Sequence, residues 1–187
     1  MSPVATPSRS LSSSPARDLV LGGLFIALAL VLPMAFHLLG AGKAFSPMHI
    51  PVFLAAFTTV PWVAVLVGLT VPLLSSLLTG MPPLSPPVAQ GMVFELACYA
   101  LVTALVYRST RRIYLSWAAG AIAGRLVLGL FGAAVLPLFG FASVPLFYPL
   151  TAGLVSGLPG LAVQAVLVPP IIYAVERMSN RKATSGR

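Results

Sequence analysis

The stretch HIPVFLAAFTTVPWVAVLVGLTVPLLSSLLT, residues 49 to 79, decides the fold of this chain. It is mostly apolar and contains no Asp, Glu, Lys or Arg. A helix needs about 20 residues to cross the hydrocarbon core of a bilayer, so the stretch is long for one crossing and short for two. Pro61 lies near its middle, where one helix can end and another begin. The number of crossings made here therefore fixes the topology of the protein.

The remaining sequence is also typical of an integral membrane protein. Hydrophobic residues make up 58% of the chain and charged residues 7%, whereas about 25% of the residues in a soluble domain are charged. Four further segments are long and apolar enough to cross a membrane: residues 18 to 38, 88 to 107, 113 to 139 and 150 to 176. The net charge of +8 does not indicate a nucleic-acid partner, because the basic residues lie at the ends of apolar segments.

The placement of arginine and lysine indicates how many times residues 49 to 79 cross. Charged clusters rich in these residues lie at residues 9 to 18, 108 to 112 and 176 to 187, and such clusters favour the cytoplasmic side. A single crossing would place Arg108 outside while the N-terminus stayed inside. We therefore predict two helices, at about 49 to 60 and 61 to 79. The fold class is an all-α membrane protein with six transmembrane helices and both termini in the cytoplasm.

This topology gives one membrane domain and two tails. We expect a disordered N-terminal tail at residues 1 to 16, a six-helix membrane domain at 17 to 178, and a basic, also disordered, C-terminal tail at 179 to 187. The external loops become residues 39 to 48, 80 to 87 and 140 to 149. They are rich in Gly and Pro, so they can fold over a pocket without helical structure.

Two charged residues, Glu95 and Arg125, lie inside the predicted helices. Ionisable groups at membrane depth are costly, which makes them candidates for a functional site. At a rise of about 1.5 Å per residue, Glu95 lies about 10 Å and Arg125 about 12 Å below the outer face. We therefore expect them at the same depth on adjacent antiparallel helices. They form either a structural ion pair or part of an outward-opening cavity, in which the guanidinium would bind a carboxylate or phosphate.

Other polar residues lie near the same outer level. Gln90 and Tyr99 share the helix of Glu95, and Gln164 lies in the outer half of the last helix. These residues are candidates for ligand binding. A buried glutamine can also serve only to bond a neighbouring helix.

The first external loop contains Lys43 and is bracketed by His37 and His49. The histidines are interfacial anchors or ligand contacts, and only weak candidates for metal ligands, because the sequence has no HExxH spacing and no second carboxylate nearby. Lys43 is either an exposed cation or part of a lid that attracts an anion. We predict no metal site.

The first predicted helix contains a close-packing motif. Gly23 and Ala27 form a small-xxx-small step, which lets another helix approach closely, either within the bundle or from a partner subunit. Any ATP hydrolysis must come from a partner, because the chain has no GxxxxGK[ST] loop. The chain also lacks a GxSxG elbow and paired membrane carboxylates, so we do not expect an enzyme. Its single cysteine, Cys98, cannot form an intrachain disulfide.

Five segments carry a family resemblance: FSPMHIPVFLAAF (45 to 57), TVPLLSSLLTGMPPLSPP (70 to 87), MVFELACYALVTALVYR (92 to 108), AGRLVLGL (123 to 130) and GLPGLAVQAVLVPPIIYAVER (157 to 177). With the small residues of the first helix, they resemble the substrate-binding S component of an energy-coupling factor (ECF) vitamin transporter over nearly all of residues 18 to 177. HIPVFLAAF is similar to the niacin- and pyridoxine-type branches. Niacin, pyridoxine, pantothenate and other vitamins stay open as substrates.

The resemblance implies a six-helix protein of a bacterial or archaeal cell membrane that captures a vitamin from outside and covers it with the first external loop. It implies that the protein topples in the membrane to release the vitamin, driven by a membrane T component and two cytoplasmic ATPases, and that it holds no cofactor. The family's AxxxA motif, which meets the T component, is matched by Gly23 and Ala27, with glycine at the first position. The family's ligand pocket overlaps the region of Glu95, Tyr99, Arg125 and Gln164.

Two other classes of function were weighed against this one. A channel or structural subunit would need a continuous polar stripe, whereas the polar residues here gather near the outer side. An intramembrane enzyme such as a protease would have to work with one membrane glutamate.

Overall fold

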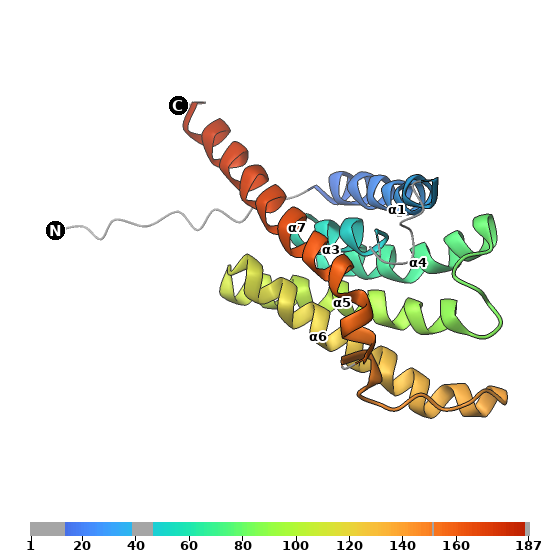
Figure 1. Cartoon of the computed structure of the whole chain (residues 1–187). Helices are drawn as coiled ribbons and strands as arrows, with labels where there is room; N and C mark the ends of the chain where they lie inside the picture. The colour runs from blue at the N-terminus through green and yellow to red at the C-terminus, as the bar shows by residue number, and fades with distance from the viewer. Residues whose placement is uncertain (1–13, 39–46, 151, 186–187) are drawn as a thin grey trace.

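The computed structural model describes residues 14–38, 47–150 and 152–185 (Figure 1). Within these ranges the chain forms helices and connecting turns and contains no β-strand, which confirms the all-α prediction. The α-helices are α1 (Pro15–Leu38), α3 (His49–Thr58), α4 (Pro61–Thr79), α5 (Val88–Thr110), α6 (Ile113–Leu130) and α7 (Ala152–Ser185).

Residues 49 to 79 form two helices, as the charge pattern predicted. α3 ends at Thr58, Thr59 takes an extended conformation, and Pro61 occupies the first turn of α4. Proline suits this position because it has no N–H to leave unpaired and its φ angle is already helical. With its ten residues, α3 is about 15 Å long, half of the hydrocarbon thickness.

Among the described residues, five helices are long and apolar enough to cross a membrane: Pro15–Phe36, Pro61–Thr79, Val88–Thr110, Ile113–Phe139 and Gly157–Met178. Large apolar side chains are exposed along all of them. In water such a surface would be unfavourable, but it is suited to contact with lipid chains. The chain is therefore a multi-pass membrane protein.

The span that begins with α6 has an irregular end. α6 continues into a π-helical turn, η1 (Phe131–Val135), and a 3-10 turn, η2 (Leu136–Phe139). The chain then turns at Gly140, whose φ of 79° is in the left-handed region that glycine adopts readily. A second 3-10 turn, η3 (Tyr148–Leu150), precedes α7.

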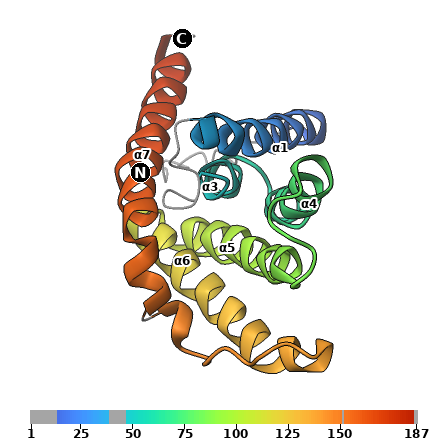
Figure 2. The ribbon, with the colours of Figure 1, turned by 45° about the vertical axis from the view of Figure 1, so that its right-hand side comes forward.

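Helix α5 lies at the centre of the bundle (Figure 2). It packs against α3, α4 and α6, while α1 covers α3 and α4. α7 runs along one side of the bundle, at a steep angle to α5, and contacts α3, α6 and η3. One apolar cluster joins α1, α3, α4 and α5, and a second joins α3, α5, α6 and α7. The axis of α5 therefore provides the frame on which any central site is built.

We name the two ends of the bundle by their chemistry. The arginine end is where α5 finishes, at residues 108 to 112, and the loop end is where residues 80 to 87 join α4 to α5. α7 lies beside Arg125 at Gly157, near its start, reaches Tyr107 at Glu176, and continues to Ser185. The helix thus extends beyond residue 176, where the predicted membrane-crossing segment ends.

Candidate functional site

Glu95 and Arg125 meet between α5 and α6. Arg125 Nε lies 3.6 Å from Glu95 Oε1, and the two side chains are 14% and 3% exposed. The expectation that both reach one depth on neighbouring helices agrees with this contact. The ion pair is enclosed by protein, so each charge offsets part of the desolvation cost of the other.

Two glycines of α6 permit this contact. A Cβ atom on Gly124 would come within 2.9 Å of the Tyr99 ring and the backbone oxygen of Glu95, and one on Gly120 would overlap the Thr103 hydroxyl. Because both residues lack a Cβ, α6 approaches α5 closely at this level. Arg125, next to Gly124 in the chain, is thereby held against Glu95.

Tyr99 connects this pair to an aromatic cluster. It lies one turn after Glu95 on α5, is almost fully buried, and interacts through its side chain with both Glu95 and Arg125. Its ring packs edge-on against His49 and Phe53, at centroid distances of 5.3 Å and 5.2 Å. Such edge-to-face contacts fix ring orientation. His49 is thus a buried member of the cluster, and does not lie in an exposed loop.

Several buried side-chain atoms of α5, α6 and α7 have no hydrogen-bond partner among the described residues: Glu95 Oε1, Arg125 Nε, Trp117 Nε1 and Gln164 Oε1. The separation of the ion pair is longer than the 2.7–3.2 Å typical of an N–H···O bond, so it leaves both of its facing atoms unbonded. A buried polar atom without a partner is costly and often marks a ligand-binding site.

The first half of α7 borders this region. Gln164 is 1% exposed, and a Cβ on Gly157 would lie 3.3 Å from a terminal nitrogen of Arg125. The guanidinium therefore lies against the α7 backbone. Glu95, Tyr99 and Arg125 come together beside α7, and Gln164 is buried about two turns farther along that helix.

Gln90 has a different environment. Its Nε2 donates to the Leu84 carbonyl at 3.2 Å, and the Ser75 and Ser76 hydroxyls donate to the carbonyls of Met81 and Pro82 at 2.7 Å each. These bonds hold the loop of residues 80 to 87 against the ends of α4 and α5. Gln90 therefore shapes the loop end.

The other predicted site residues are not placed by the structure. His37 belongs to α1, but its side chain lies outside the described parts, as does Lys43 altogether. Among the described residues no group of three or more His, Cys, Asp and Glu could hold a metal ion.

Sequence reasoning missed a second polar cluster, at the arginine end. The Val60 N–H donates to Asp18 Oδ2 at 3.2 Å, and Arg108 donates to the Thr59 carbonyl at 2.6 Å. The junction of α3 and α4 thus has both of its free backbone groups bonded by side chains from α1 and α5. Asp18 was read only as part of a topological charge cluster. Asp18 lies at the start of an apolar span, and this position could have indicated that its carboxylate is buried.

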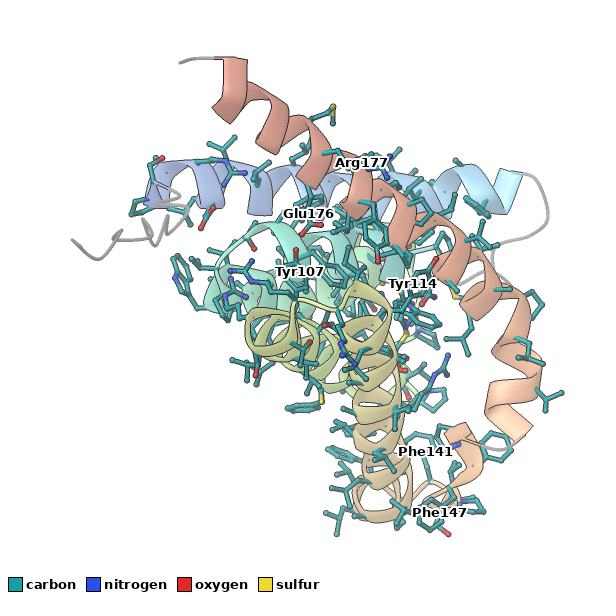
Figure 3. The ribbon with its side chains drawn as sticks, turned by 90° about the vertical axis from the view of Figure 1, so that its left-hand side faces the viewer. Tyr107, Tyr114, Phe141, Phe147, Glu176 and Arg177 are labelled. Atoms are coloured by element: carbon teal, nitrogen blue, oxygen red, sulfur yellow. The ribbon has the colours of Figure 1, made fainter. Side chains whose placement is uncertain are left out.

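The same end also holds α7 to α5. The Tyr107 hydroxyl donates to Glu176, and the Arg111 guanidinium lies over the Tyr107 ring, 5.6 Å from its centroid. Figure 3 shows Tyr107 on α5 directed toward Glu176 on α7. A cavity of about 470 Å³ lies beside this contact, lined by Pro170, Tyr173, Ala174 and Arg177. It is distant from the Glu95–Arg125 pair.

The two glycines of α1 face opposite directions. Gly22 is buried, and a Cβ there would lie 2.7 Å from Val63 of α4. Gly23 is exposed, as is Ala27, and a Cβ on Gly23 would meet no atom within 4 Å. The Gly23–Ala27 step therefore remains open on the surface, while Gly22 is used for packing inside the bundle.

Comparison with known proteins gives one match. The family model described as "ECF transporter, substrate-specific component" matches residues 17–172, a range that includes α5, α6 and the part of α7 that contains Gly157 and Gln164. No curated protein and no solved structure is significantly similar to the chain. Since the match covers most of the sequence, the chain belongs to the substrate-specific (S) components of ECF transporters, which are substrate-binding membrane subunits and not enzymes.

Proposed function

We propose that this S component captures a water-soluble vitamin or related micronutrient from outside the cell, in the region between α5, α6 and α7. Glu95, Tyr99, Arg125 and Gln164 would contact the ligand, with His49 supporting Tyr99 and Gln90 holding the loop end. His37 and Lys43 would contribute from the first external loop. The observation that carries this proposal is the set of buried polar atoms on α5, α6 and α7, both facing atoms of the ion pair included, that have no hydrogen-bond partner among the described residues.

The proposal includes six crossings, with the arginine end and both termini in the cytoplasm of a bacterium or archaeon. Bonds from Asp18, Arg108 and Glu176 bring the three basic clusters to one end of the bundle, and the positive-inside rule favours the cytoplasm for that end. The loop end, and with it the binding region, would then face outward.

The proposed partners are a membrane T component and two cytoplasmic ATPases. The exposed Gly23–Ala27 step supports docking of the T component on α1, because small residues let a second helix approach. The ATPases would supply the energy for uptake.

The binding site is tested by removing both charges together. Arg125→Ala alone would leave Glu95 uncompensated and would lower stability as well as affinity. The double variant Glu95→Gln with Arg125→Gln removes the pair without leaving a lone charge, and such replacements are often close to neutral for stability. We expect an unchanged melting temperature and an affinity lower by about 100-fold or more for the small molecule that co-purifies with the protein, identified by mass spectrometry. If calorimetry gave the same affinity for the double variant as for the wild-type protein, the ion pair would have only a structural role.

The docking face is tested by a matched pair of neighbouring substitutions. Gly23→Leu should spare folding and ligand binding but prevent co-purification with the T component. Gly22→Leu should instead lower the melting temperature, because the side chain would clash with Val63. Normal assembly of the folded Gly23→Leu variant would exclude this face as the docking surface.

A further inference from the structure

The charges of the binding region balance one another. Among the described residues, the ionisable pair at this level is Glu95 and Arg125, 3.6 Å apart. The acid and base of the arginine end, Asp18 and Arg108, bond the α3–α4 junction, and Arg108 lies about 20 Å farther along α5 than Glu95. A ligand in the region would therefore meet a guanidinium whose charge is already compensated.

This balance bears on the charge of the ligand. An anion that approached Arg125 would also approach the Glu95 carboxylate, and like charges at short range in a protein interior repel strongly. A cation would meet the same difficulty at the guanidinium. A ligand that carries a net charge would also lose its hydration on entry without gaining a counter-ion.

The unbonded atoms of the pair bear on the shape of the ligand. Glu95 Oε1 is an acceptor and Arg125 Nε is a donor, and neither has a partner among the described residues. The two atoms are 3.6 Å apart. A ligand edge with one donor and one adjacent acceptor, such as a carboxamide, lactam or ureide, would bond to both atoms. A carboxylate has two acceptors and no donor, so it would satisfy only the arginine.

We infer that the ligand of this site has no net charge at neutral pH and binds the Glu95–Arg125 pair through an adjacent hydrogen-bond donor and acceptor. The inference rests on the proposed function and narrows its substrate class. It departs from the expectation that Arg125 binds a carboxylate or phosphate, because the structure pairs this arginine with Glu95.

The test uses the purified full-length protein and the small-molecule extract of the cells that produce it. The extract is separated at pH 7 into an anionic, a cationic and an unretained fraction by ion exchange. Each fraction is incubated with the protein, and the molecules that stay bound after washing are identified by mass spectrometry. We expect the bound molecule to come from the unretained fraction and to contain an adjacent donor and acceptor.

Two variants make the result specific to the pair. Glu95→Gln keeps the shape of the side chain but unbalances the charge, and should weaken retention of that molecule by about tenfold or more. Arg17→Gln removes an exposed charge at the arginine end and should leave retention unchanged.

The outcomes separate the two proposals. A bound anion or cation would overturn the inference while the function as a vitamin-binding subunit stood. Full retention by a folded Glu95→Gln variant would also overturn it. If the wild-type protein retained nothing from any fraction, the binding site itself and the inference with it would be lost.

Discussion

Helix α5 carries two buried polar clusters, about 20 Å apart along its axis, which differ in how their polar groups are bonded. At the arginine end, Asp18, Arg108 and Tyr107 each bond to a group on another helix or on the α3–α4 junction. At the level of Glu95, both facing atoms of an ion pair have no hydrogen bond to any residue that the structure describes. A cluster that satisfies itself serves the fold, whereas one that leaves donors and acceptors free is suited to a ligand.

The largest effect on stability should come from Asp18→Ala. The substitution removes the buried acceptor of the Val60 N–H, so we expect a loss of about 2 kcal/mol in the free energy of unfolding. Chemical or thermal unfolding in detergent micelles would measure it. The folded fraction should bind its small molecule with unchanged affinity, and weaker binding at equal stability would assign Asp18 to the site.

Tyr107→Phe should have the next largest effect. It deletes only the hydroxyl that donates to Glu176, and a hydrogen bond to a charged group contributes about 1.5 kcal/mol. Tyr114→Phe is the matched control, because Tyr114 is exposed and surface changes usually cost less than about 0.5 kcal/mol. If the two variants melt at the same temperature, α7 is not held to α5 by this bond.

Gln164→Leu should not lower the stability of the protein, in contrast to Asp18→Ala and Tyr107→Phe. The amide oxygen has no partner in the described part of the protein, so its removal should leave the ligand-free stability unchanged or raise it by up to about 1 kcal/mol. The affinity for the small molecule should fall by about tenfold, the value of one lost hydrogen bond. Calorimetry of unfolding tests the predicted stability, and calorimetry of binding tests the predicted affinity. A destabilised variant with full affinity would show that Gln164 stabilises the fold and does not bind the ligand.

The smallest effect should come from Arg17→Ala. Arg17 Nη1 lies 3.5 Å from the Asp18 carboxylate but is 55% exposed, and exposed ion pairs contribute about 0 to 1 kcal/mol. Unfolding at low and at high salt should give nearly the same small difference. A loss equal to that of Asp18→Ala would mean that Asp18 acts through its surface arginine, and not through the bond to Val60.

Much of the fold could be predicted because it follows from the placement of charged residues and from the regular geometry of a helix. The break between α3 and α4 followed from the placement of Arg108 and the position of Pro61. The meeting of Glu95 and Arg125 followed from the rise per residue of a helix. Both arguments use quantities that every transmembrane helix shares.

The parts that could not be predicted depend on which side of a helix faces which neighbour. Asp18 was read as a topological charge, but it reaches the α3–α4 junction. Gln90 shares a helix with Glu95, but it bonds to the loop beneath it. Gly22 and Gly23 are adjacent in the chain, yet only one contacts α4. The rotation of each helix about its own axis decides which side chains face a neighbour. This rotation is set by packing between helices, which cannot be read from a single sequence.

The bond between Asp18 and Val60 also has a mechanical consequence. Most of α1 lies on the outside of the bundle, so on packing alone a pulling force could strip this helix away. Asp18 tethers its first turn to the α3–α4 junction, which Arg108 fastens to α5. A load applied at Gly23 would be transmitted along these two links to the central helix.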